Sequence, residues 1–187
     1  MSSRKLVFWS GVLVVAAVAA AGAVAGTRSH SSVTTVKAVS PGLTIKVNRY
    51  IQSNLRWNKD VYTVASGGTI HVVNLFADEG PHTFTIVKKR DAPRTGKQVE
   101  NCRICNALGK AHGADPNGGD APPKFPFLED GVGQQDPPNV DKPGDSGVTG
   151  KGKKGESIDL DVTAAPGTKL WMMCLVHPWM QAEIDVT

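Results

Sequence analysis

A stretch near the end of the chain, "WMMCLVHPWM" at residues 171–180, carries three side chains that bind metals. Cys174, His177 and Met180 follow one another at intervals of three residues. A thiolate, an imidazole and a thioether are soft or borderline ligands, and the spacing is too short to place them on separate elements. We therefore expect a strand to end at Cys174 and another to begin near Met180, with the intervening loop directing all three side chains to one point.

A fourth ligand must come from elsewhere in the chain. His82 is the natural candidate, because it follows a glycine–proline pair and begins an alternating segment. Two imidazoles, a thiolate and a weak thioether form the ligand set of blue copper sites. Taken singly, these side chains would be ordinary core or surface residues. Together they predict one copper ion bound by His82, Cys174, His177 and Met180.

The segments around these residues have the patterns of β-strands. Residues 43–88 contain "LTIKVNR", "GGTIHVVNLF" and "HTFTIVKK", and residues 156–186 contain "ESIDLDVT", "KLWMMC" and "MQAEIDVT". In "KLWMMC" a period of two places Leu170, Met172 and Cys174 on one face. Short strands separated by turn residues, without helical periodicity, predict an all-β sandwich.

Between the strand regions, residues 89–155 are rich in glycine, proline and aspartate. They lack a periodic apolar pattern, so we expect a long irregular insert. A short helix around Asn106–Ala111 and packing of "FPFL" at Phe125–Leu128 are its candidate anchors.

The insert contains a CxxC pair, Cys102 and Cys105. Asn106 stands where a haem attachment site requires histidine. Two cysteines do not complete a structural zinc site, although His112 offers a third ligand. The pair is a candidate disulfide, and a redox-active or Cu(I)-binding pair and free thiols are the alternatives.

The segments "GGTIHVVNLFADEGPHTFTIV" and "APGTKLWMMCLVHPWMQAEIDV" resemble the cupredoxin family. The loop Cys-x2-His-Pro-aromatic-Met is most similar to the amicyanin form, whereas plastocyanin-type loops have more residues between the histidine and the methionine. The resemblance implies a Greek-key β-sandwich with a mononuclear type 1 copper site. The chain departs from the small family members in its insert, and in Thr83, where amicyanin and plastocyanin have asparagine. We expect the Thr83 hydroxyl to link the two ligand loops by a hydrogen bond.

The resemblance implies an electron carrier that is not an enzyme in itself. Type 1 sites that feed a second copper usually have histidines flanking the cysteine, whereas Met173 and Leu175 flank it here. We expect a monomer whose redox partner proteins dock at Pro178 and Trp179, beside His177. The alternative is a copper chaperone or storage protein that uses the CxxC pair and the methionines.

The first residues predict export. Arg4 and Lys5 precede a long uncharged run, so residues 1–26 are a cleaved signal peptide or a membrane anchor through residues 6–26. We expect residues 27–42 to be a linker and residues 43–187 to form the domain outside the cytoplasm, whether periplasmic, secreted or membrane-anchored. The net charge of +4 is scattered and forms no stripe, which argues against a nucleic-acid function.

Overall fold

The structure is a computed structural model that describes residues 32–76, 80–115 and 123–187. The predicted signal or anchor at residues 1–26 lies outside these ranges. Among the described residues, no helix has the length and apolar character needed to cross a membrane.

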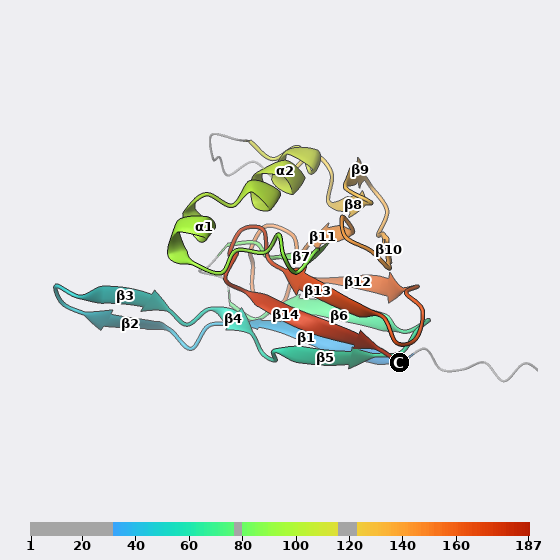
Figure 1. The fold of residues 1–187 in the computed structure, drawn as a ribbon, viewed down its shortest axis with the longest axis horizontal. Helices are drawn as coiled ribbons and strands as arrows, with labels where there is room; N and C mark the ends of the chain where they lie inside the picture. Colours follow the sequence, from blue (N-terminus) through green and yellow to red (C-terminus); the bar gives the residue numbers. More distant parts are fainter. Residues whose placement is uncertain (1–31, 77–79, 116–122) are drawn as a thin grey trace, which may run out of the picture.

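Two β-sheets pack face to face (Figure 1). The first sheet has the order β10 (Asn139–Val140), β12 (Ser157–Val162), β6 (Thr69–Asn74), β1 (Val33–Val39) and β4 (Arg56–Trp57). The second has the order β5 (Val61–Val64), β14 (Gln181–Val186), β13 (Lys169–Met173), β7 (Thr83–Val87), β11 (Ser146–Val148), β8 (Phe127–Glu129) and β9 (Val132–Gln134).

Consecutive strands cross between the sheets. Strand β6 of the first sheet is followed by β7 of the second, and β12 by β13. Strands far apart in sequence therefore become neighbours, as β12 does with β6 and β13 with β7. This connectivity is that of a Greek-key sandwich, and it confirms the predicted fold class.

The main core lies between the two sheets. Strands β5, β6, β12 and β14 bury alternate residues in it, as the period of two predicts. Leu170, Met172 and Cys174 pack together in this core, as predicted from the sequence.

We predicted a linker at residues 27–42. This prediction is wrong for Val33–Val39, which form strand β1. Strand β1 pairs in parallel with β6 from Val33 opposite Thr69 to Ala38 opposite Asn74. Val36 and Ala38 are buried. Only these two side chains of β1 enter the core, so its sequence has too short an alternation to stand out.

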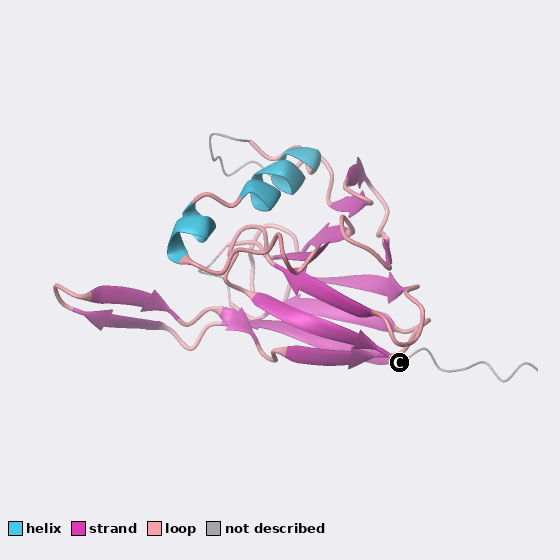
Figure 2. Cartoon of the chain, in the orientation of Figure 1, coloured by secondary structure: helices cyan, strands magenta, loops and turns pink. Residues whose placement is uncertain are grey.

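The insert is not irregular in its described part. It forms α1 (Gly96–Glu100), α2 (Arg103–Ala111) and the short strands β8 to β11. Both helices lie on the same side of the molecule (Figure 2). A second apolar cluster joins Leu108 of α2 and Leu128 of β8 to Val87 and Met173 of the second sheet. A few apolar residues are enough to hold the insert, because they pack against the second sheet. Such scattered residues show no periodic pattern in the sequence.

Strands β2 (Leu43–Lys46) and β3 (Tyr50–Ser53) form a separate hairpin that projects from one end of the sandwich (Figure 1). The expected strand over residues 43–49 ends at Lys46. Asn48 adopts a positive φ of 57°, and Arg49 N–H donates to the Lys46 carbonyl across the turn.

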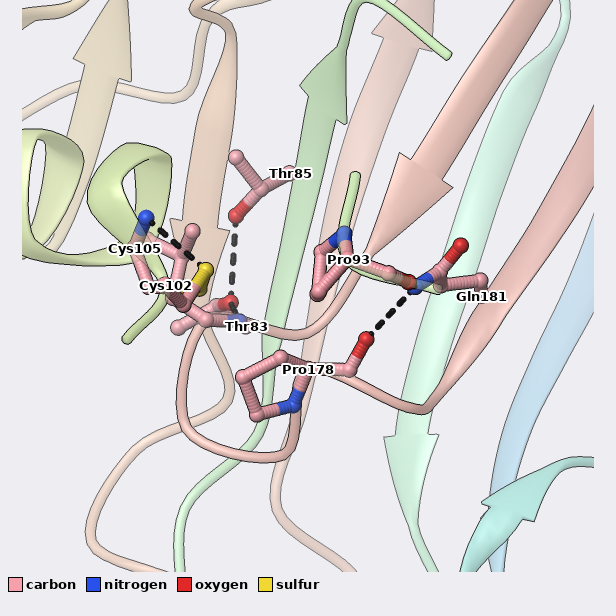
Figure 3. Close-up of a disulfide and its surroundings, with 8 residues drawn as sticks. Thr83, Thr85, Pro93, Cys102, Cys105, Pro178 and Gln181 are labelled. Carbon is pink, nitrogen blue, oxygen red and sulfur yellow. Dashed lines mark hydrogen bonds between the residues drawn. A yellow bond between two sulfur atoms is a disulfide. The ribbon is translucent and has the colours of Figure 1, made fainter. Parts of the chain in front are cut away.

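Cys102 and Cys105 are joined by a disulfide at the start of α2. The Cys102 sulfur also accepts a hydrogen bond from Cys105 N–H at 3.3 Å, so Cys102 caps the start of the helix. Both half-cystines are nearly buried in the second cluster, and Figure 3 shows the disulfide with Thr83 in its surroundings. The disulfide thus closes a short loop at the start of α2, and both half-cystines pack in the cluster that lies against the second sheet.

Replacing both cysteines, Cys102→Ser with Cys105→Ser, should lower the free energy of unfolding by about 2 kcal/mol. The reason is that the unfolded chain regains the entropy of a short closed loop. Urea unfolding of the copper-free protein measures the loss, and reduced wild-type protein should unfold at the same urea concentration as the variant. An unchanged midpoint in the variant would show that the disulfide does not constrain the insert.

Candidate metal centre

Three neighbouring strands of the second sheet bring the predicted ligands to one edge. His82 immediately precedes β7, Cys174 immediately follows β13, and Met180 immediately precedes β14. Strand β13 lies between β7 and β14 and is antiparallel to both. The starts of β7 and β14 therefore meet the end of β13 at the same edge.

The distances between the ligand atoms fit a single metal ion. The Cys174 Sγ lies 3.9 Å from His82 Nδ1 and 3.8 Å from His177 Nδ1. One ligand atom from each of these residues lies within 4.8 Å of the others. A trigonal ion with bonds of about 2.0 Å to nitrogen and about 2.3 Å to sulfur, the lengths seen for zinc, separates such atoms by about 3.7 Å.

Met180 closes the ligand loop. Its N–H donates to the His177 carbonyl at 2.8 Å, and its carbonyl accepts from Cys174 N–H at 3.0 Å. The Trp57 indole N–H donates to the same carbonyl at 3.1 Å. The Met180 side chain is fully buried in the cluster that contains Cys174. The expected strand end and strand start are confirmed, whereas the part played by Trp57 was not evident from the sequence.

Burial favours the neutral forms of both inner ligands. Burial, and then the nearby His177, lower the pKa of His82 to about 4. Burial raises the pKa of the Cys174 thiol, against the opposing hydrogen bond from Thr83 N–H. His82 Nδ1, the nitrogen that faces Cys174 Sγ, is the atom available to a metal, and Nε2 is buried without a hydrogen-bond partner among the described residues. A neutral imidazole can bind a cation directly, and a thiol loses its proton when a metal binds. These residues therefore fit a copper ion.

Thr83 links the two ligand segments. Its N–H donates to the Cys174 sulfur at 3.3 Å. Its hydroxyl oxygen accepts from Leu175 N–H at 2.7 Å. The hydroxyl expected to join the loops therefore does so, and the backbone of Thr83 adds a second bond directly to the thiolate ligand.

A second threonine, Thr149, holds His82 from the insert side. Its hydroxyl accepts from His82 N–H at 3.1 Å and donates to the His82 carbonyl at 3.1 Å. Its own N–H donates to that carbonyl at 2.9 Å. The sequence analysis missed Thr149, because it stands just before a glycine- and lysine-rich loop and only β11 brings it beside β7.

The outer side of the site is apolar and partly exposed. His177 is half-buried, and the Trp179 ring meets it edge-on at 5.4 Å. Trp179 is 44% exposed, and its indole N–H donates to the Leu55 carbonyl at 3.0 Å. Val176, which the sequence analysis did not single out, is exposed on the same loop.

Pro178 is buried, which corrects its expected place on the docking surface. Its carbonyl accepts a hydrogen bond from the Gln181 side-chain amide at 2.7 Å, and the same amide nitrogen donates to the Pro93 carbonyl at 2.7 Å. Figure 3 shows this arrangement. Gln181 thereby draws the proline inward and leaves Trp179 as the exposed ring.

His112, considered as a zinc ligand with the CxxC pair, is committed elsewhere. Its Nδ1 lies 2.8 Å from the Phe125 carbonyl and its Nε2 lies 2.9 Å from the Ser146 hydroxyl. Burial lowers its pKa. With both ring nitrogens hydrogen-bonded and both cysteines in a disulfide, these residues do not form a zinc site.

Three carboxylates, from Glu129, Asp130 and Asp145, also lie within reach of one another. The buried Asp145 accepts backbone N–H groups from Asp130, Asp141 and Lys142, each at 3.0 Å. These bonds occupy both carboxylate oxygens. Asp145 is therefore a structural residue that closes the turn before β11.

Replacing Thr83 by valine should lower the free energy of unfolding of the copper-free protein by about 1–3 kcal/mol. The shape is kept, but Leu175 N–H loses its acceptor in a partly buried place. Thr83→Ser retains the hydroxyl and serves as the control in urea unfolding. Equal stability of the valine variant and the wild type would show that the hydroxyl does not hold the loop.

No family model matches the chain, and no curated protein matches it. Solved structures do. Auracyanin A, a blue copper protein from Chloroflexus aurantiacus, is 16% identical over 84% of this chain and 99% of its own, with a TM-score of 0.44. A reduced Cu(I) form of an amicyanin mutant is 11% identical over 86% of this chain and 87% of its own, with a TM-score of 0.40. A blue copper oxidase from Nitrosomonas europaea is 13% identical over 82% of this chain and 38% of its own, with a TM-score of 0.38.

At such low identities and TM-scores, the assignment rests on the strand order and the ligands of this chain. Two histidines and a cysteine converge at one edge of the second sheet, with a buried methionine closing the loop. This is the ligand set of blue copper. The chain is thus a Greek-key β-sandwich whose described residues hold the ligand set of one type 1 copper ion.

Proposed function

We propose that the protein carries single electrons between redox partner proteins. The observation that carries this proposal is the meeting of two imidazole nitrogens and a thiol sulfur in one small group of ligand atoms. Bound copper would supply the one-electron chemistry. A ligand set that satisfies neither oxidation state fully suits rapid electron exchange.

The surrounding residues keep the ligands in place while the charge changes. His82 and Cys174 are fully buried, so water has little access to that side of the site. The Thr83 N–H donor points at the sulfur and stabilises its negative charge. Thr149 fixes the backbone of His82. Ligands held this firmly have little to rearrange when an electron arrives or leaves.

His177 is the ligand best placed to pass the electron. It is half-buried, whereas His82 is fully enclosed, and it lies against the exposed Trp179. A partner that covers Trp179 would come close to the imidazole. Small, weak interfaces of this kind suit rapid turnover.

The surroundings of the thiolate favour a carrier over an enzyme. Met173 packs into the second apolar cluster and Leu175 packs against it. The residues on either side of Cys174 thus make apolar contacts, and neither is a histidine that could bind a second copper ion.

The alternative, a copper chaperone or store, requires Cys102 and Cys105 to bind Cu(I). Their sulfurs are joined to each other and nearly buried, which favours the carrier. A stable disulfide is also typical of oxidising compartments, which supports our proposal that the protein works outside the cytoplasm.

Titration of the copper-free protein with Cu(II) tests the function. We expect one ion per chain, intense visible absorption from the thiolate, and reversible one-electron reduction. Cys174→Ser should lose the absorption and keep the far-ultraviolet circular dichroism of the sandwich. A colourless protein that binds only Cu(I) would favour the chaperone, and a variant that keeps the visible band would refute the site.

Met180→Leu should keep the copper and its colour but raise the reduction potential. The thioether is a weak donor that favours Cu(II), and each tenfold loss of that preference raises the potential by about 59 mV. Met172→Leu, in the core on β13, is the control and should leave the potential unchanged. Voltammetry decides, and a lower potential in Met180→Leu would count against an axial role.

A further inference from the structure

The β2–β3 hairpin presents an apolar face to solvent. Its register places Ile45 opposite Ile51 and Leu43 opposite Ser53 on one face. The two isoleucines are 64% and 72% exposed, and Leu43 is 60% exposed. A free two-stranded hairpin is marginally stable in water, and exposed apolar patches commonly mark interaction sites.

The segment that follows the hairpin is hydrogen-bonded to the copper-binding loop. Leu55, two residues after β3, accepts the indole hydrogen bond of Trp179. Trp57 of β4 donates to the Met180 carbonyl. A groove of about 660 Å³ lies beside this junction, lined by Ser53 at the base of the hairpin, Val99 of α1 and Trp179. One surface therefore runs from His177 past Trp179 and the groove to the hairpin.

This end of the molecule is positively charged. Residues 43–59 contain four basic residues and no acidic one, namely Lys46, Arg49, Arg56 and Lys59. Arg94 lines the groove from the other side. Residues 123–187, by contrast, hold ten acidic and six basic residues. The segment that carries the hairpin and follows it toward the proposed electron exit is therefore basic.

We infer that the apolar face of β2–β3 and the groove beside Trp179 together form the docking surface for a redox partner protein with an acidic surface. The inference rests on the proposed electron-carrier function. The basic residues steer an acidic partner toward the copper end, and the hairpin supplies apolar contact beyond the small area around His177.

Two other occupants fit the surface less well. A second copy would bring two basic ends together and be repelled. A membrane would cover the hairpin but would bring no redox group to His177. A partner protein uses the hairpin, the groove and the exposed ligand at once.

Electron exchange with a soluble acidic c-type cytochrome tests the inference, using copper-loaded full-length protein in stopped flow. The double variant Ile45→Ser, Ile51→Ser should exchange about tenfold more slowly than the wild type, which corresponds to about 1.4 kcal/mol of lost contact. Its visible spectrum, its melting temperature and its exchange with hexacyanoferrate, a small inorganic oxidant, should not change.

The control variant Val33→Ser, Val132→Ser removes equally exposed apolar side chains away from the copper end, since these are 63% and 69% exposed. It should exchange electrons with the cytochrome at the wild-type rate. High salt should slow the wild type, because the steering charges are screened.

An unchanged rate of exchange with the cytochrome in the isoleucine variant would overturn the docking surface. So would sedimentation with phosphatidylglycerol vesicles that depends on the hairpin while the cytochrome rate is unchanged. A concentration-dependent dimer that the isoleucine variant no longer forms would overturn it as well. A wild-type protein that binds no copper, or exchanges no electron with hexacyanoferrate, would overturn the proposed function itself.

Discussion

The pairing of β7 with β13 is the constraint on which the site depends. The register places Met173 opposite Thr85, so Cys174 leaves the sheet beside Thr83 and close to His82. The bond from Thr83 N–H to the cysteine sulfur continues this pairing beyond the last residue of β13. The position of Cys174 is thus set by the strand pairing and by the adjoining bond from Thr83.

The insert also contacts Thr83, through a series of buried polar side chains. A line of buried polar groups runs from His112 to Ser146 at 2.9 Å, from Ser146 to Thr85 at 2.7 Å, and from Thr85 to Thr83 at 3.0 Å. The Phe125 carbonyl can only accept, so His112 donates to it from Nδ1, and the Thr85 hydroxyl donates to the Thr83 hydroxyl. These contacts connect the insert to Thr83, the residue that holds the thiolate ligand, through buried polar side chains. The insert therefore supports the ligand loops as well as covering the sheet.

The sequence predicts the metal ligands better than the residues that hydrogen-bond to the ligand segments. Cys174, His177 and Met180 are neighbours along the chain, so their spacing is visible without a fold. Thr149 and Trp57 reach the site through tertiary pairing, and nothing in their immediate sequence indicates it. The alternation of residues 43–49 correctly predicts a strand, but a period of two cannot tell whether its apolar face is covered by a core or left to solvent. The register of β2–β3 and the exposure of Ile45 answer that question.

Burying the His82 imidazole costs the fold stability, whether or not a metal binds at its Nδ1 atom, which faces Cys174 Sγ. His82 is fully buried, and its Nε2 has no hydrogen-bond partner in the described part of the chain. A buried polar atom left unpaired destabilises the folded state. The hydrogen bonds that His82 N–H donates to Thr149 and that Leu175 N–H donates to Thr83 offset this cost by holding the backbone. The ligands are already gathered in the folded chain, so a metal that binds need not order the loop. Its binding free energy therefore adds to the stability of the sandwich.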